Sequence, residues 1–93
     1  MQKAAIRHIS IHLPESVLTN EELALEFGGI WTPEKIFEKT GISTRHIAGE
    51  DECASDLGVK AGKKLFREAG KTPGDFDFLL FCTQSPDYFL PAT

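Results

Sequence analysis

The sequence predicts an α/β fold with a mixed sheet and a long crossover helix. Residues 9–13 alternate between apolar and polar side chains, as in a strand with one covered face. Residues 51–69 repeat their apolar side chains at helical spacing, and residues 78–82 are apolar without interruption. A strand without polar alternation is typical of a sheet covered on both faces. A long helix that leads into such a strand predicts a right-handed crossover to a parallel neighbour.

The first strand ends at Pro14, which cannot donate to a strand ladder. Two short helices follow. Thr19 and Glu22 have the spacing of a capping box, and the Gly28–Gly29 pair ends the helix that they open. The same signals recur over residues 32–41, with a threonine cap, proline at the first helical position and a glycine stop. Residues 45–48 are expected to be extended.

The main helix is expected to run from about Asp51 to Ala69 and to stop at Gly70. Its apolar face includes small residues that allow close packing against a neighbour, and consists of Ala54, Leu57, Gly58, Ala61, Leu65 and Ala69. Residues 72–75 are expected to form a turn or a single helical turn. Residues 91–93 resemble the start of another helix, so we expect the chain to be the front piece of something larger.

Composition limits the possible functions. The 93 residues carry a net charge of -4 and lack the basic stripe of a nucleic-acid or anionic-membrane binder. No apolar run reaches the roughly 20 residues that span a bilayer, and the first residues show no signal-peptide pattern. We therefore expect a cytoplasmic location. One basic cluster on the long helix is either a solvated face or a docking patch for an acidic partner; it contains Lys60, Lys63, Lys64 and Arg67.

The residues alone give no complete catalytic set. His8 and His12 are about 13 Å apart along a strand, too far to share one metal ion, and no metal site is expected. Cys53 and Cys82 are expected to be free thiols. Cys53 lies near a helix N-terminus and is either structural or reactive, whereas Cys82 is expected to pack inside the apolar strand.

Three further residues have two interpretations each. Arg45 and His46 form either a hydrogen-bonded structural pair or part of a cleft. Trp31 is either a stacking surface for a flat ring or part of a local core. The glycines do not form a phosphate-binding loop.

Several motifs together resemble 3-oxoacyl-acyl-carrier-protein synthase III, a member of the thiolase superfamily. They cover essentially the whole chain and lie in residues 9–15, 18–23, 31–36, 39–42, 45–48, 54–57 and 83–93.

The resemblance implies a thiolase-like fold, with two similar α/β halves, and a homodimer. It implies condensation of an acyl-CoA with malonyl on acyl carrier protein, with loss of carbon dioxide, as a step in fatty acid biosynthesis. Coenzyme A thioester is then a substrate, and no covalently bound cofactor is expected. The family's nucleophilic cysteine, histidine and asparagine all fall beyond Thr93, and neither cysteine of this chain matches the nucleophile. Residues 1–93 are therefore expected to be a truncated N-terminal segment of a condensing-enzyme domain, inactive alone.

The resemblance implies binding roles for three residues, which are Lys39, Trp31 and Leu90. Lys39 takes the place of an arginine near the coenzyme A nucleotide and keeps its charge without the planar fork. The family's adenine-stacking tryptophan aligns with Lys35, and Trp31 lies one turn further away. Leu90 takes the position that lines the partner subunit's acyl tunnel; ordinary loop packing is the alternative.

Two other functions remain open, and the departure at Lys35 bears on the first of them. One is a related condensing enzyme of specialised metabolism, such as quinolone or hydrocarbon synthesis. The other is a non-catalytic interaction module. A cysteine soon after Thr93 in a longer reading frame favours an enzyme, and a stop codon there favours the module. The apolar strand predicts that the isolated chain is marginally stable and that a partner, a swapped strand or aggregation covers this strand.

Overall fold

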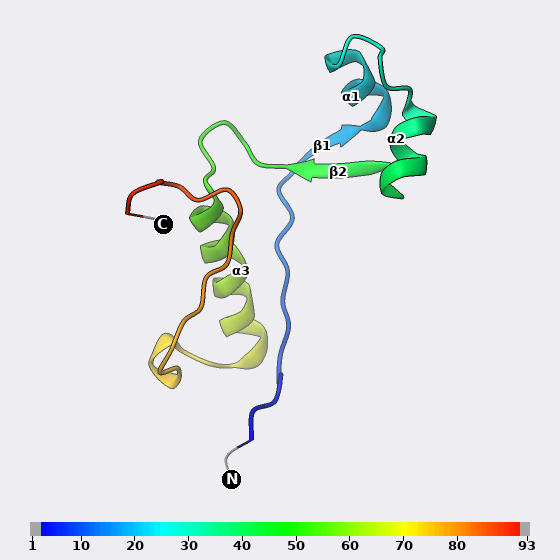
Figure 1. The fold of residues 1–93 in the computed structure, drawn as a ribbon. Helices are drawn as coiled ribbons and strands as arrows, with labels where there is room; N and C mark the ends of the chain where they lie inside the picture. Colours follow the sequence, from blue (N-terminus) through cyan, green and yellow to red (C-terminus); the bar gives the residue numbers. More distant parts are fainter. Residues whose placement is uncertain (1–2, 92–93) are drawn as a thin grey trace. The chain divides into compact units, whose positions relative to one another are not determined.

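A computed structural model describes residues 3–91 (Figure 1). The elements follow the order β1 (Ser16–Thr19), α1 (Asn20–Glu26), α2 (Pro33–Thr40), β2 (Thr44–Ile47), α3 (Ala54–Ala69) and the 3₁₀ turn η1 (Pro73–Asp75). The chain forms two compact units. The hairpin unit is Leu13–Asp51, and the α3 unit contains the described residues up to His12 and from Glu52 onward. None of the helices described is long and apolar enough to cross a membrane.

The hairpin unit is built on an antiparallel strand pair. β1 and β2 pair from Ser16 opposite Ile47 to Thr19 opposite Thr44, and α1 and α2 lie between them in the sequence. The small apolar core of this unit is formed by Ala24 and Ile36, one from each helix. The hairpin unit thus brings α1, α2 and the strand pair together.

Local capping signals set the ends of both short helices. The Thr19 hydroxyl accepts a hydrogen bond from the Glu22 N–H at 3.2 Å, and the Glu22 carboxylate accepts one from the Thr19 N–H at 3.3 Å. This reciprocal pair is the predicted capping box. In α2 the Thr32 hydroxyl accepts from the Lys35 N–H at 3.2 Å, and the helix stops at Gly41, whose φ is 71°. The predicted helices are therefore confirmed.

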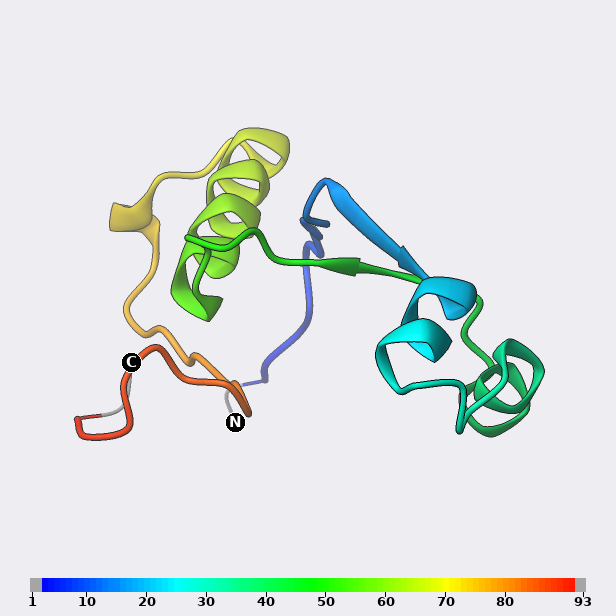
Figure 2. The ribbon, with the colours of Figure 1, turned by 90° about the horizontal axis from the view of Figure 1, so that it is seen from above.

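The α3 unit is organised around the long helix. α3 ends at Ala69 before Gly70, whose φ of 65° is left-handed, as predicted. It begins at Ala54, later than the predicted Asp51, because the Asp56 carboxylate accepts a hydrogen bond from the Cys53 N–H at 2.8 Å and makes Cys53 the cap. The single turn η1 confirms the turn expected at residues 72–75. After η1 the chain runs back alongside α3 (Figures 1 and 2).

Two predicted strands are absent from the described residues. Residues 9–13 and 78–82 have no strand partner, and the sheet within residues 3–91 is the antiparallel pair alone. Both strand assignments are wrong for this structure. Ile9 remains 74% exposed and Leu80 85% exposed, and Cys82 is exposed rather than packed inside a strand. The helix expected at residues 91–93 extends outside the described residues.

Candidate functional site

The exposed side of α2 carries Lys39, which the resemblance places near a nucleotide, and Lys35, which stands where the family has its stacking tryptophan. Lys35 and Lys39 are four residues apart and both exposed, so they share one face of the helix. Neither forms an ion pair with another residue of the range 3–91. Trp31 precedes the Thr32 cap and is 41% exposed. With a rise of 1.5 Å per residue, Trp31 and Lys39 are about 12 Å apart along the axis, at opposite ends of α2.

The turn after α2 is held by Asn20, which sequence reasoning did not single out. Asn20 is only 4% exposed, and its amide nitrogen donates to the Ile42 carbonyl oxygen at 2.8 Å. Its amide oxygen accepts from the Arg45 guanidinium at 2.6 Å, and its backbone N–H donates to the Ser43 carbonyl at 3.2 Å. A buried polar group with all these bonds fixes its surroundings. Asn20 therefore holds the turn that follows Lys39.

Arg45 and His46 have structural partners, as one of the two interpretations predicted. The Arg45 guanidinium binds Asn20 and also donates to the Leu18 carbonyl oxygen at 3.5 Å. His46 Nδ1 lies 2.6 Å from the Pro14 carbonyl oxygen, which can only accept. Nδ1 therefore carries the proton. These contacts tie the two strands of the hairpin unit together.

A groove of about 400 Å³ lies on another side of α2. Its lining includes Pro33 and Phe37 together with Glu21 and Glu34. Two glutamates disfavour a phosphate at this place, because like charges repel. The lysine face is the better candidate for an anionic group such as a nucleotide phosphate.

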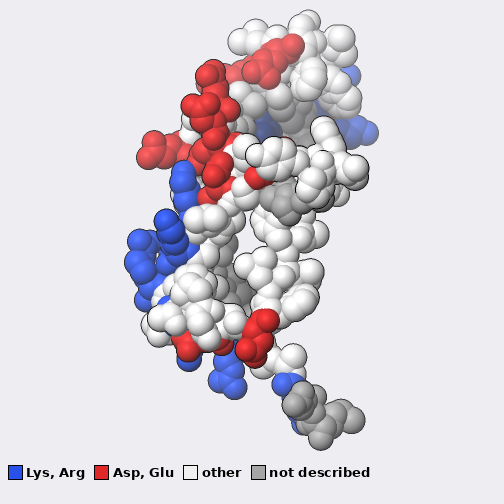
Figure 3. Space-filling model, turned by 90° about the vertical axis from the view of Figure 1, so that its left-hand side faces the viewer, with Lys and Arg blue, Asp and Glu red and all other residues white. Residues whose placement is uncertain are grey.

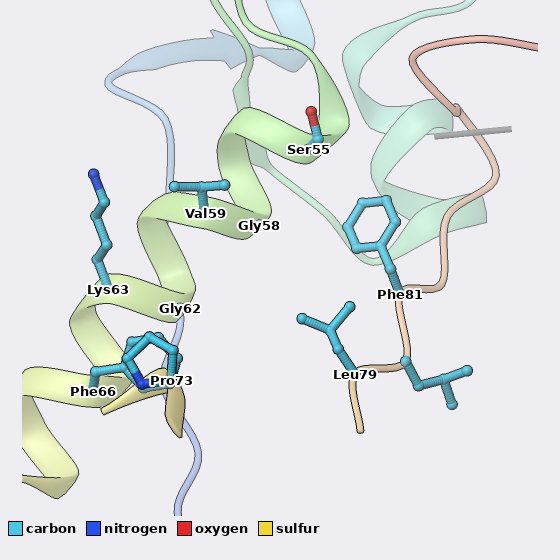
Figure 4. Close-up of a pocket in the computed structure, with 10 residues that line it drawn as sticks. Ser55, Gly58, Val59, Gly62, Lys63, Phe66, Pro73, Leu79 and Phe81 are labelled. Atoms are coloured by element: carbon cyan, nitrogen blue, oxygen red, sulfur yellow. The ribbon is translucent and has the colours of Figure 1, made fainter. Parts of the chain in front are cut away.

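The α3 unit contains a second, larger groove of about 660 Å³ between α3 and residues 79–81 (Figure 4). Its wall on α3 includes two glycines, Gly58 and Gly62. A β-carbon placed on Gly58 would lie 3.1 Å from an edge carbon of the Phe81 ring. The ring thus lies directly over the helix backbone, and the predicted role of small residues in close packing is confirmed at Gly58.

The loop that carries Leu90 is attached to the start of α3. The Ser55 N–H donates to one carboxylate oxygen of Asp87 at 3.1 Å, and the Ser55 hydroxyl donates to the other. The described residues after Asp87 are open to solvent: Phe89 is 91% exposed and Leu90 95% exposed. Sequence reasoning did not predict this pairing. The only signal was that both partners lie in motifs that carry the family resemblance.

Part of the basic cluster of α3 serves internal contacts. Lys and Arg side chains gather together on the face shown in Figure 3. The α3 helix carries four basic residues. Lys60 pairs with Glu52, and Lys64 donates to the Ile11 carbonyl oxygen at 3.1 Å. Lys64 also lies 3.9 Å from Glu68. These contacts favour a structural, solvated face over a docking patch.

Glu68 links α3 to the segment before the hairpin unit. Its carboxylate lies 3.2 Å from His8 Nε2 and accepts from the Ser10 hydroxyl at 3.4 Å. The hydrogen bond with His8, supported by the nearby Lys64, lowers the pKa of Glu68. Within residues 3–91 no cluster of histidine, cysteine and acidic side chains could hold a metal ion. The two thiols, Cys53 and Cys82, are free as predicted, and both are exposed.

Comparison with known proteins identifies what the chain is similar to, although no family model matches it. It is 43% identical over its whole length to the beta-ketoacyl-[acyl-carrier-protein] synthase III of Campylobacter jejuni strain 81116, of which it covers 28%. The protein of the same name from Erythrobacter litoralis gives the same identity and coverage. That of Sulfurovum sp. is 41% identical over 97% of this chain and 26% of its own length.

A solved structure agrees. The crystal structure of a 3-oxoacyl-(acyl-carrier-protein) synthase III superposes with a TM-score of 0.78 and 48% sequence identity. The match covers 94% of this chain and 26% of the solved one. The resemblance found in the motifs and the thiolase-like α/β fold class are thereby confirmed. The chain spans little more than a quarter of the curated relatives' length, at 28% in the first of them.

Proposed function

We propose that this chain is the N-terminal part of a longer 3-oxoacyl-acyl-carrier-protein synthase III-like acyltransferase. The enzyme condenses an acyl-CoA with malonyl-acyl carrier protein and releases carbon dioxide, as a step in fatty acid biosynthesis. The observation that carries this proposal is the 43% identity along the entire chain to enzymes of that name. The backbone likeness to a solved enzyme of that name, with a TM-score of 0.78, also supports it.

In this proposal α2 contributes to the coenzyme A site. Lys39, with Lys35 one turn before it, attracts the nucleotide phosphates of the acyl-CoA. Both are exposed, so a phosphate can reach them from solvent. An ammonium group binds a phosphate as a point charge, without the bidentate fork of arginine. Trp31 is proposed to contact the adenine ring from the start of the helix.

The remaining assignments concern parts of the enzyme outside these residues. Residues 1–93 are proposed to be one segment of a thiolase-like domain, and the rest supplies the cysteine nucleophile, histidine and asparagine. A cysteine at a helix N-terminus is a chemically suitable nucleophile, because the helix dipole favours thiolate. The enzyme is proposed to act as a cytoplasmic homodimer in which Leu90 lines the partner subunit's acyl tunnel. Its partners are acyl carrier protein and acyl-CoA.

The substitution at Lys35 favours a second candidate, a condensing enzyme of specialised metabolism with a different acyl donor. The family's stacking tryptophan is replaced here by a cation, so the adenine loses a flat surface at that position. A test therefore compares acetyl-CoA, longer acyl-CoAs and acyl donors carried on acyl carrier protein. Preference for acyl-CoA with malonyl-acyl carrier protein supports the primary proposal.

The direct experiment is expression of the longest reading frame that contains this chain. Release of carbon dioxide and formation of a 3-oxoacyl product are expected from the long protein and not from residues 1–93 alone. A native stop codon after Thr93, or a long protein without condensing activity, would contradict the enzyme assignment and favour the interaction module.

Substitutions on α2 test the coenzyme A site. Lys39→Ala is expected to raise the KM for acyl-CoA by about tenfold, the loss of one charged hydrogen bond, with little change in kcat. Lys39→Arg keeps the charge and is expected to preserve the KM. Lys63→Ala, an exposed lysine on α3, is the matched control. An unchanged KM in Lys39→Ala would contradict the assignment of Lys39.

A further inference from the structure

The contact between Ser55 and Asp87 connects the first turn of α3 to the loop that carries Leu90. Ser55 offers two donors, its backbone N–H and its hydroxyl, and each meets a different oxygen of the Asp87 carboxylate. Asp87 itself is only partly exposed, in contrast to the side chains that follow it. Two hydrogen bonds to one planar carboxylate restrain both its position and its rotation.

The negative charge of Asp87 strengthens this contact. The first backbone N–H groups of a helix lack partners within the helix and carry a partial positive charge. Ser55 is the second residue of α3, so its N–H is one of these groups. A carboxylate that accepts from it binds more strongly than a neutral oxygen does. The amide of an asparagine could still bond both groups of Ser55, because its nitrogen can donate to the hydroxyl oxygen, but it lacks the charge that strengthens the contact.

A second contact defines the path of the same loop six residues earlier. The Phe81 ring lies over Gly58, less than one helical turn from Ser55, at a distance that leaves little space for a side chain at that glycine. The loop is therefore fixed to α3 at Phe81 and again at Asp87. Leu90 follows three residues after the second point, and 95% of its side chain is exposed.

From this arrangement we infer that Asp87, bound by Ser55, is the positioning residue that determines where Leu90 is presented, and thereby the length of acyl chain that the enzyme accepts. The inference rests on the proposed function, because it needs Leu90 to line an acyl tunnel. It goes further in naming the contact that sets chain-length preference. A side chain three residues from its last anchor moves when that anchor is released.

The experiment uses the full-length enzyme and compares kcat/KM for acetyl-CoA and octanoyl-CoA. Ser55→Ala removes one hydrogen bond, and Asp87→Asn removes the negative charge that faces the helix N-terminus. Both are expected to reduce the preference between the two substrates by about tenfold, which is the range of small changes in an apolar pocket. Ser55→Thr retains the hydroxyl and is expected to keep the preference. Asp77→Asn, an exposed carboxylate between η1 and Phe81, is the matched control.

The ratio of the two substrates separates positioning from general damage. A variant that is merely less stable loses both activities equally and keeps its preference. An unchanged ratio in Ser55→Ala and Asp87→Asn would overturn the inference, as would an equal change in Ser55→Thr. If Asp87→Asn does not fold, Ser55→Ala decides, because it keeps the backbone bond to Asp87. An inactive wild-type enzyme would instead contradict the proposed function.

Discussion

Asn20 provides the sharpest test of how the hairpin unit is held together. Replacing it by alanine leaves the backbone bond to Ser43 but removes both side-chain hydrogen bonds, one to the Ile42 carbonyl and one to the Arg45 guanidinium. A neutral hydrogen bond contributes about 0.5–1.5 kcal/mol to stability, and one to a charged group about 1.5–3 kcal/mol. Alanine returns at most about 0.7 kcal/mol through its higher helix propensity. The free energy of unfolding is therefore expected to fall by about 1.3–4.5 kcal/mol.

Urea unfolding followed by tryptophan fluorescence measures this change. Trp31 is the single tryptophan of the chain and belongs to the same unit as Asn20, so its signal reports on the part that is perturbed. A loss of 2 kcal/mol changes the ratio of folded to unfolded protein about 30-fold. Asn20→Asp should be intermediate, since a carboxylate can still accept from Arg45 but repels the Ile42 carbonyl oxygen.

Two controls make the result decisive. Glu26→Ala changes an exposed residue of the same helix and is expected to alter stability by less than about 0.5 kcal/mol. A double-mutant cycle of Asn20→Ala with Arg45→Ala should give a coupling energy of about 1 kcal/mol or more, as expected for residues in one hydrogen-bond network. A loss below about 0.5 kcal/mol in Asn20→Ala, or a coupling near zero, would refute the reasoning.

Three other predictions follow from the α3 unit. Gly58→Leu should displace the Phe81 ring and lower the melting temperature measured by circular dichroism. Gly58→Ala should be nearly neutral, because a gain in helix propensity of about 1 kcal/mol offsets the crowding. Equal melting temperatures of Gly58→Leu and wild type would contradict the packing of Phe81 on Gly58. The carboxyl of Glu68 should titrate in NMR with a pKa below its ordinary value of 4.5. Its contact with His8 is therefore fully present above pH 4.5 and is lost as the pH falls through the lowered pKa. A titration midpoint at or above 4.5 would be inconsistent with the contact. Leu80 is 85% exposed and should promote self-association of the 93-residue chain. Leu80→Lys should therefore raise the dissociation constant measured by sedimentation by about tenfold or more. A wild-type chain that stays monomeric at all concentrations would disprove this.

The parts of the fold that depend on neighbouring residues were predictable. The cap at Thr19 and the stop at Gly41 each act within four residues, and both are where the sequence predicted them. The start of α3 was misplaced because Asp56 captures the Cys53 N–H, a choice among several acidic residues that periodicity does not resolve. Local chemistry therefore predicts helices well and their first residue less well.

Strands were less predictable because a strand needs a partner. Residues 78–82 have the composition of a buried strand, yet no strand lies beside them in the described residues. Conversely, Ser16–Thr19 has little apolar alternation and becomes β1 through its pairing with β2. Composition indicates what a segment can do, and pairing decides whether it does so.

The candidate site was likewise predictable only where it depends on residues that are close in the sequence. Helical spacing is enough to place Lys35 and Lys39 on one face of α2. The role of Asn20 could not be predicted, because its side-chain partners are 22 and 25 residues away in the sequence. The pairing of Ser55 with Asp87 spans 32 residues and was equally inaccessible. The chain order alone does not indicate which distant polar groups meet.

The register of the strand pair has a topological consequence. Ser16 lies opposite Ile47, so the polypeptide enters and leaves the hairpin unit at neighbouring points. A segment whose two ends lie close together can be lengthened, shortened or replaced by a brief linker without moving the chain on either side of it. Evolution could thus remodel helix α2 independently of the scaffold around α3, and a protein engineer could graft this segment from one relative into another as a single cassette.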